Sequence, residues 1–350
     1  MKLLFHCESV YQILVACRIK MEIYKNDSAD VILSSSIRNY KQLAENLSTT
    51  KLFDSVYTQD LNLINFTKLQ KVFLNLIDIK DLNLSEDIIK KSYDRYFVCY
   101  PNQVKGLLYN LLKKKNKNLE LYAYEDGLST YSHLYENRFY VVNKKKGLRA
   151  LLLHENKFYF KGLKAVYVFE PKYFTWTKNK CIKIPKITEN DTQYINVVNT
   201  TFNYENDGVK IKEKVIFFEE SYNSDGKPVD DMPIINHLIS EYGAENVLIK
   251  HHPRADYNRL ESLGLNIMPS SHIPWEIYIM NNYKELKNVL LVSIASGCIF
   301  SPYIMFDMKF NCMACFNLFD KKDLYADIYD VYSKIAKENN VKMFEFNNKG

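Results

Sequence analysis

Glycine and proline are scarce in this chain, at 10 and 9 of its 350 residues. The sequence contains neither a G-x-G-x-x-G pattern nor a Walker pattern, which are the usual signatures of glycine-rich phosphate loops. Any phosphate that binds to this protein must therefore be held by other groups, such as side chains and the N–H groups of a helix start.

Long apolar runs are also missing, since none approaches the roughly 18 residues of a membrane-spanning helix. The start at 1–6 does not resemble a signal peptide, because His6 and Glu8 interrupt it and no small-residue cleavage site follows. The seven cysteines are odd in number and scattered, which favours thiols in the cytoplasm over disulfides. Cys312 and Cys315 form one C-x-x-C pair that nothing nearby completes as a zinc site. We expect a cytoplasmic protein without a metal.

The charge balance is mildly basic, with a net charge of +6. Two lysine runs, at 113–117 and 144–146, hold much of the positive charge. Such runs usually form solvated faces, but they also suit peripheral contact with an anionic membrane at its inner face. Without a recognised motif beside them, they do not predict a nucleic-acid partner.

Strand and helix signals alternate along the chain, which is long for a single core. Strands are expected at 2–7, 29–34, 95–100, 119–124, 214–219, 246–251, 289–293 and 308–312. Helices are expected at 9–24 after a Ser9 cap, 37–47, 103–112, 232–242, 275–282 and 322–337, with another opening near Gly297. This alternation predicts an α/β protein of two Rossmann-like, doubly wound domains that face a central cleft. We place them at 1–190 and 209–350, joined by a polar linker at 191–208, with the last helix in the second domain.

The apolar run at 246–249 ends in a cluster of cations and imidazoles. Lys250, His252 and Arg254 lie around Pro253, which cannot continue a strand. Open α/β sheets bind ligands at the carboxyl ends of their strands. The cluster therefore predicts a phosphate site, although a solvated basic turn would have the same composition.

Two further predicted strand ends are followed by residues that could take part in catalysis or in phosphate binding. Glu125 and Asp126 precede Gly127, which suits either an ordinary tight turn or a carboxylate placed to act as a base. The third strand end runs from Ser293 through Ser296 to Gly297, where hydroxyls and free N–H groups open a helix and can bind phosphate.

These motifs, in this order, resemble those of the bacterial sialyltransferases of glycosyltransferase family 52, the lipooligosaccharide and capsule type. Similar motifs occur in the marine multifunctional sialyltransferases and the polysialyltransferases. The resemblance includes the acidic pair with its glycine, the His-Pro, the serine turn about forty residues later, and the opening S-V-Y-Q at 9–12. The chain departs from the pattern at Ser296-Gly297, where relatives often carry paired serine or threonine, and at Glu125, where some carry aspartate.

The resemblance implies a GT-B fold and an inverting enzyme that moves sialic acid from CMP-sialic acid to a terminal galactose-type acceptor of a surface glycan. His252 is expected to stabilise or protonate the leaving phosphate, which Ser293, Ser296 and Lys250 also contact. Glu276 is the candidate for the ribose hydroxyls, because a carboxylate can accept two hydrogen bonds from a diol. No two aspartates lie two positions apart, so the D-x-D metal motif of GT-A transferases is absent and no metal is expected.

The base is expected to be Asp126, which ends a first-domain strand and matches the acidic motif of the relatives. Asp230 and Asp231, after the first strand of the second domain, are the rival bases, and Glu219 and Glu220 are weaker ones. Two other functions stay open: a GT-B transferase with a different nucleotide-sugar donor, and a non-catalytic sugar- or nucleotide-binding protein. The sequence also leaves open the acceptor sugar, the choice between an α2,3 and an α2,6 linkage, and whether the protein forms a homodimer.

Overall fold

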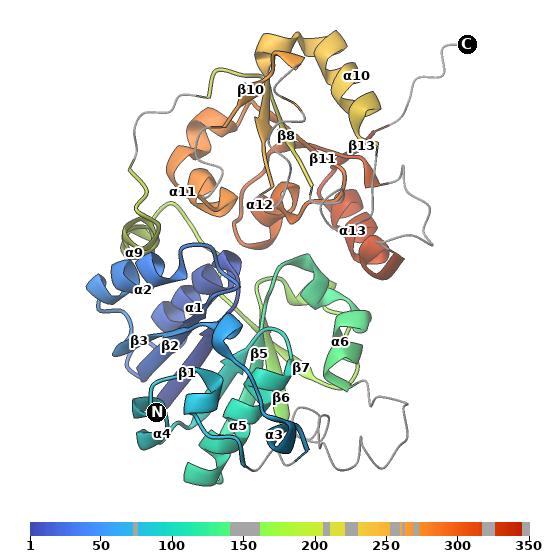
Figure 1. Ribbon diagram of the computed structural model, residues 1–350. Coiled ribbons are helices and arrows are strands. Elements are labelled where there is room, and N and C mark those ends of the chain that lie inside the picture. The colour runs from blue at the N-terminus through green and yellow to red at the C-terminus, as the bar shows by residue number, and fades with distance from the viewer. Residues whose placement is uncertain are drawn as a thin grey trace. The chain divides into compact units, whose positions relative to one another are not determined.

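The computed structural model divides the chain into two compact units, each built on its own parallel sheet (Figure 1). The first unit comprises Met1–Pro185 and Thr192–Asn203, and the second comprises Lys186–Asp191 and Tyr204–Gly350. The residues that the structure describes are 1–72, 76–140, 162–205, 211–220, 230–252, 260, 263–268, 273–316 and 326–344. The predicted pair of doubly wound α/β domains is confirmed.

The first unit has a seven-stranded sheet in the order β3-β2-β1-β4-β5-β6-β7, with parallel pairing throughout. Its strands are β1 (Lys2–Cys7), β2 (Ser28–Ser34), β3 (Ser55–Gln59), β4 (Arg95–Val98), β5 (Glu120–Tyr124), β6 (Leu163–Val168) and β7 (Lys180–Lys183). Its helices are α1 (Val10–Glu22), α2 (Tyr40–Thr49), α3 (Lys68–Val72), α4 (Asp87–Lys90), α5 (Gln103–Lys115), α6 (His133–Tyr140) and α9 (Thr192–Phe202). The strand order reverses between β1 and β4, and doubly wound sheets bind ligands beyond the strand ends at such a point.

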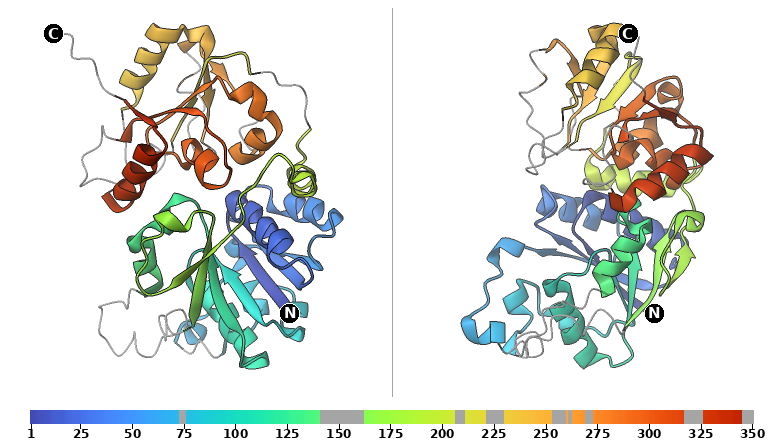
Figure 2. Two further views of the ribbon diagram at one scale, coloured as in Figure 1. Left: turned by 180° about the vertical axis from the view of Figure 1, so that it is seen from behind. Right: turned by 90° about the vertical axis from the view of Figure 1, so that its right-hand side faces the viewer.

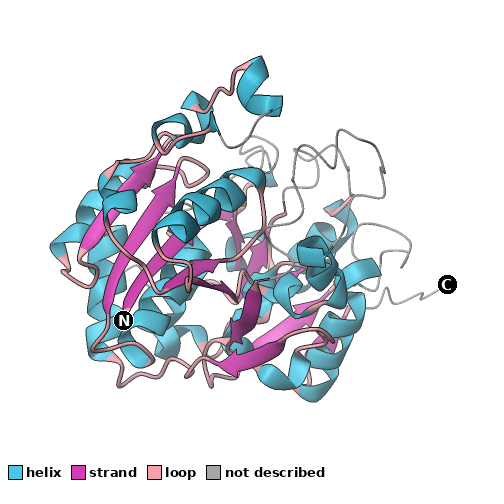
Figure 3. Ribbon diagram, turned by 90° about the horizontal axis from the view of Figure 1, so that it is seen from below, coloured by secondary structure: helices cyan, strands magenta, loops and turns pink. Residues whose placement is uncertain are grey.

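The second unit has a six-stranded parallel sheet in the order β10-β9-β8-β11-β12-β13. Its strands are β8 (Val215–Phe218), β9 (Val247–Lys250), β10 (Asn266–Ile267), β11 (Leu290–Ser293), β12 (Asn311–Ala314) and β13 (Lys342–Met343). Its helices are α10 (Met232–Tyr242), α11 (Trp275–Leu286), α12 (Ser301–Ile304) and α13 (Ala326–Glu338). The order reverses here between β8 and β11, and Figure 3 shows helices packed along the strands of each unit.

The core of each sheet follows from runs of apolar residues that are buried on both faces, as parallel sheets require. In β1, Leu3, Leu4 and Phe5 are fully buried, and the Phe5 ring stacks on Phe97 of β4 with centroids 4.5 Å apart. All four residues of β8 are buried as well. The seven cysteines, all in the described part of the chain, are free thiols.

The stretch predicted as a linker, 191–208, contains the helix α9 (Figure 2). Tyr194, Val198 and Phe202 recur every fourth residue, so they share one helix face, and all three are buried. This face packs on α1 and α2 of the first unit, where the Tyr194 hydroxyl donates to Leu14 O at 3.0 Å. Because the residues between these three positions are mostly polar, the sequence shows no clear helical period here.

Several other elements differ from expectation in their bounds. The helix expected at 37–47 begins at Tyr40, because Asn39 before it adopts a left-handed φ of 57°. The strand expected at 308–312 is β12, which begins at Asn311. No helix in the described ranges is both long and apolar enough to cross a membrane.

Candidate active site

Glu125 follows β5 directly and is fully buried. Its carboxylate accepts hydrogen bonds from the Tyr11 hydroxyl at 2.6 Å, the Tyr131 hydroxyl at 2.5 Å and the Phe169 N–H at 2.9 Å. Burial raises the pKa of Glu125 to about 7, and these three donors oppose the rise. Because its partners come from α1, the turn after Gly127 and the end of β6, Glu125 ties these segments together.

Asp126 is half-buried, next to that anchored residue. Its Oδ1 accepts a hydrogen bond from the Ser9 hydroxyl at 3.2 Å, and its N–H donates to Thr130 Oγ1 at 2.8 Å. Burial raises the pKa of Asp126, and the polar side chain of Gln12 partly offsets the rise. Gly127 has a φ of 74°, which favours glycine, and a Cβ there would meet nothing within 4 Å. The backbone conformation, rather than lack of space, therefore requires this glycine.

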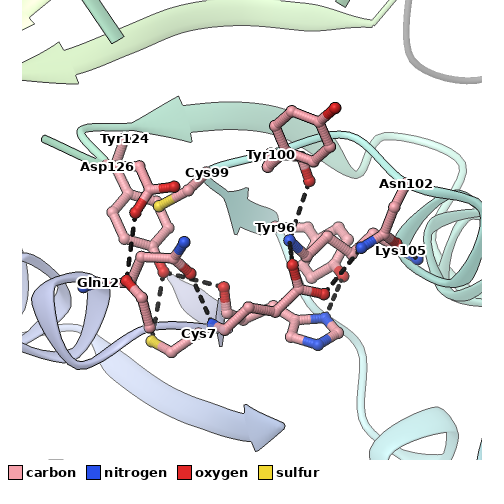
Figure 4. Close-up of polar contacts among 12 residues, drawn as sticks. Cys7, Gln12, Tyr96, Cys99, Tyr100, Asn102, Lys105, Tyr124 and Asp126 are labelled. Atoms are coloured by element: carbon pink, nitrogen blue, oxygen red, sulfur yellow. Dashed lines mark hydrogen bonds and ion pairs between the residues drawn. The ribbon is translucent and has the colours of Figure 1, made fainter. Parts of the chain in front are cut away.

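A buried ion pair lies beside Asp126, at the point where the strand order of the first sheet reverses (Figure 4). Lys105, which is fully buried, donates to Glu8 Oε2 at 2.7 Å and to Tyr100 O at 2.9 Å. Asn102 donates to Glu8 Oε1 at 2.8 Å and caps α5 through its side chain. The sequence interpretation missed this group; the Asn102 cap just after a buried strand was its only local signal.

In the second unit, the charges of Lys250 and Glu276 interact at the carboxyl end of the sheet. Both side chains are buried, at 7% and 8% exposure. Burial lowers the pKa of Lys250 and raises that of Glu276, and each charge partly offsets the effect on the other. Lys250 Nζ also donates a long hydrogen bond of 3.4 Å to Ile273 O. An anion next to Lys250 would stabilise its charged form.

The serine turn follows β11 and is held by Glu220 of the neighbouring β8 segment. Glu220 Oε1 accepts from the Ser293 hydroxyl at 3.1 Å and from Ala295 N at 3.2 Å. Ser293 Oγ in turn accepts from Ser296 N at 2.8 Å, and Ser296 Oγ accepts from Cys298 N at 3.3 Å. Within the described residues, the half-buried Ser296 uses its oxygen as an acceptor, so its O–H can donate to a ligand.

His252 follows β9 and is half-buried, and its neighbours Pro253 and Arg254 lie outside the described residues. The preceding residue, His251, is buried and its Nδ1 forms a short hydrogen bond with Glu219 Oε2. Glu219, a weaker candidate for the base, is thus engaged in a buried pair.

The rival bases occupy the start of α10. Asp230 is exposed, and its Oδ1 accepts a hydrogen bond from Met232 N at 3.1 Å. Asp231 is buried at 6% exposure and holds the N-cap position, without a cap bond from its side chain. Across the described ranges, no cluster of three or more His, Cys, Asp or Glu side chains could hold a metal ion.

The sequence profile described as Alpha-2,8-polysialyltransferase (POLYST) matches residues 3–312. None of the curated proteins compared with this chain matches it.

Solved structures of similar fold include an alpha/beta-galactoside alpha-2,3-sialyltransferase from the luminous marine bacterium Photobacterium phosphoreum. It aligns with a TM-score of 0.56 at 14% identity, over 98% of this chain and 98% of that chain. The glycotransferase of kitacinnamycin aligns with a TM-score of 0.54 at 10% identity, over 98% of this chain and 85% of that one. These likenesses show the GT-B fold, as predicted. Because the profile spans most of its length, the chain belongs to the alpha-2,8-polysialyltransferase family and is a glycosyltransferase, which confirms the predicted kinship with bacterial sialyltransferases.

Proposed function

We propose that this protein is an inverting sialyltransferase that uses CMP-sialic acid and needs no metal ion. The observation that carries the proposal is the cluster at the carboxyl ends of β8, β9 and β11, in a member of a polysialyltransferase family. There a buried cation, Lys250, interacts with the buried carboxyl of Glu276, and the hydroxyl of Ser296 stands in the turn after β11. Such a set suits a nucleoside monophosphate, with Lys250 and Ser296 on the phosphate and Glu276 on the ribose hydroxyls.

In the proposed reaction, the acceptor hydroxyl oxygen forms a bond to the anomeric carbon of sialic acid. The bond from that carbon to the phosphate oxygen breaks, and CMP leaves with the electron pair. The acceptor proton passes to Asp126, while His252 donates a hydrogen bond or a proton to the leaving phosphate. Lys250, Ser293 and Ser296 stabilise the charge that develops on that phosphate.

Two acceptors are compatible with the comparisons. The alpha-2,3-sialyltransferase of similar fold is described as acting on galactosides, which supports a terminal galactose-type acceptor on a lipooligosaccharide or capsule. The family description, alpha-2,8-polysialyltransferase, supports an acceptor that already ends in sialic acid. We propose transfer to a surface glycan of one of these two kinds.

The test is CMP release from CMP-sialic acid, measured with lactose-type acceptors, with sialic acid-terminated acceptors and with no acceptor, each with and without EDTA. We expect acceptor-dependent release that EDTA does not change. Turnover with UDP-sugars alone would identify a different donor. CMP binding without turnover on any acceptor would indicate a binding protein and contradict the proposal.

His252→Ala is expected to lower the turnover number by about 10²-fold, the usual scale for a group that assists proton transfer. The matched control is His237→Ala, since His237 is partly exposed on α10 and pairs with Glu241 at 3.0 Å. Steady-state rates of CMP release from both variants provide the measurement. A His252→Ala enzyme that turns over like the control would remove His252 from the mechanism.

Peripheral binding at the inner membrane face is proposed from the lysine run at 113–117. Lys114, Lys115 and Lys117 are exposed at and beyond the end of α5, and each lysine near anionic lipid contributes roughly 1 kcal/mol. The second run, 144–146, lies outside the described residues. We expect the protein to bind anionic vesicles at low salt and Lys→Gln changes at these three positions to weaken that binding. Equal sedimentation with anionic and neutral vesicles would contradict this.

A further inference from the structure

Three neighbouring strands of the first sheet, β1, β4 and β5, are followed by polar residues. β1 and β4 flank the point where the strand order reverses, and β5 is the next strand along. The three strands are parallel, so their carboxyl ends lie at one edge of the sheet, where sheets of this type bind ligands. Glu8 follows β1, Asn102 follows β4 and Asp126 follows β5. A ligand beyond these strand ends is therefore bordered by all three residues.

The Glu8 carboxylate is held in one orientation. Its Oε1 accepts a hydrogen bond from Asn102 Nδ2 at 2.8 Å, and its Oε2 accepts one from Lys105 Nζ at 2.7 Å. Lys105 Nζ also donates to Tyr100 O at 2.9 Å (Figure 4). Asn102 is fixed in turn, because its Oδ1 accepts a hydrogen bond from Lys105 N at 2.9 Å. The carboxylate is thus in place before any ligand binds.

The same carboxylate has capacity for further hydrogen bonds. Each carboxylate oxygen can accept two, and within the described residues each Glu8 oxygen accepts one. Lys105 is fully buried, whereas the Glu8 side chain is 14% exposed. Burial alone would raise the pKa of Glu8, but the charge of Lys105 and the two hydrogen bonds hold that pKa below its ordinary value. Glu8 is therefore an ionised acceptor group that partly faces solvent.

Stability alone gives no reason for this ion pair. The cost of taking two charges out of water can exceed the attraction between them, and apolar side chains of similar volume often replace such pairs without loss. The Glu8–Lys105 pair also lies at the strand ends and not in the middle of the core. A carboxylate that a buried cation holds rigidly does suit a binding site, where a few precisely placed polar groups set the orientation of the ligand.

Ser9 connects Glu8 to the proposed base. It follows Glu8 in the sequence, and its hydroxyl donates to Asp126 Oδ1 at 3.2 Å. Consecutive Cα atoms are about 3.8 Å apart, so Glu8 lies one residue from a direct partner of Asp126. The charges of Glu8 and Lys105 also act on the Asp126 carboxyl. A sugar whose hydroxyl reaches Asp126 therefore has Glu8 beside it.

We propose that Glu8 binds the acceptor sugar by accepting hydrogen bonds from its hydroxyl groups, while Lys105 and Asn102 hold the Glu8 carboxylate in place. This acceptor subsite rests on the proposed transfer reaction with Asp126 as the base. Glu8 selects hydroxyls because an ionised carboxylate repels the carboxylate of a charged sugar. In an acceptor that ends in sialic acid, Glu8 therefore binds hydroxyls and not the carboxylate.

The test combines Glu8→Gln, which keeps the shape but removes the charge, with acceptors that each lack one hydroxyl. The parent acceptor is lactose or sialyllactose, whichever the wild-type enzyme uses, and the analogues are its monodeoxy forms. We expect at least one analogue to lower the wild-type kcat/KM by about tenfold or more, the scale of one hydrogen bond to a charged group. The same analogue should cost Glu8→Gln at most about threefold, and such non-additivity indicates a direct contact. CMP affinity should not change.

The matched control is Glu22→Gln. Glu22 is 25% exposed and pairs at 3.5 Å with Arg18, a buried cation of the same unit. This variant should lose as much kcat/KM with each analogue as the wild-type enzyme does. If Glu8→Gln does not fold because Lys105 has lost its counterion, the double variant Glu8→Gln/Lys105→Met removes both charges and takes its place in the measurement.

The outcomes separate this inference from the proposed function. If every analogue costs the Glu8 variant as much as the wild-type enzyme, Glu8 does not touch the acceptor and the inference is wrong, while the transfer reaction stands. The same conclusion follows if no missing hydroxyl affects the wild-type enzyme. If the wild-type enzyme transfers sialic acid to no acceptor, the proposed function fails and the acceptor subsite fails with it. Non-additivity in the Glu8 variant but not in the Glu22 variant supports the inference.

Discussion

Asp126→Asn is expected to reduce acceptor-dependent transfer by roughly 10²- to 10⁴-fold while leaving the affinity for CMP unchanged. Asparagine keeps the size of the side chain and can still accept the hydrogen bond from Ser9. It cannot take up a proton from the acceptor hydroxyl, so only the transfer step should suffer. CMP affinity is measured by calorimetry, and transfer is measured by CMP release with and without acceptor.

The same measurements on Asp230→Asn and Asp231→Asn provide the matched controls, since both residues belong to the second unit. Both variants should transfer at near wild-type rates. If either were inactive while Asp126→Asn transferred normally, the base would lie at the start of α10 instead.

Asp30→Ala is expected to lower the free energy of unfolding of the first unit by about 3–5 kcal/mol, as the loss of one member of a buried ion cluster does. Asp30 of β2 is fully buried, and it accepts from Lys2 Nζ at 3.0 Å, Lys91 Nζ at 2.7 Å and the Tyr93 hydroxyl at 2.6 Å. Removing the carboxylate leaves two partly buried cations without this partner. Chemical denaturation followed by near-UV circular dichroism measures the change.

The control for that experiment is Asp87→Ala. Asp87 pairs with Lys90 at 2.8 Å, and both side chains are more than 60% exposed, so water screens the pair. Its unfolding midpoint should stay near that of the wild-type protein. Equal midpoints for both variants would mean that the Asp30 cluster contributes little to stability.

The parts of the fold that could be predicted from sequence carry clear local end signals. The helix at 232–242 matches α10, because Pro233 stands in its first turn and Gly243 ends it with a φ of 83°. β1 was likewise predicted at its observed bounds, and Ser9 caps α1 as expected. β3 was missed because only Gln59 of its five residues is buried, so its sequence has no apolar pattern.

The sequence predicts which strand ends carry the candidate site residues. It does not predict which side chains these residues contact. The sequence placed Asp126, Lys250 and Ser293 at or just past strand ends, where the structure has them. It could not show that Glu125 is buried, because that burial depends on partners more than 40 residues away, such as Phe169. For the same reason Glu220, weighed only as a base, was not expected to hold the serine turn.

The two units do not follow one another along the chain. A short segment of the second unit is synthesised before the first unit is complete. Segment Lys186–Asp191 emerges before α9, yet it belongs to the second unit, where Ile187 N donates to Met305 O at 2.8 Å. The first unit lacks the helix that covers α1 and α2 until Asn203 has emerged. During synthesis the first sheet can therefore fold before residues 186–191 have their partners. These residues find their partners only after most of the second sheet has been synthesised.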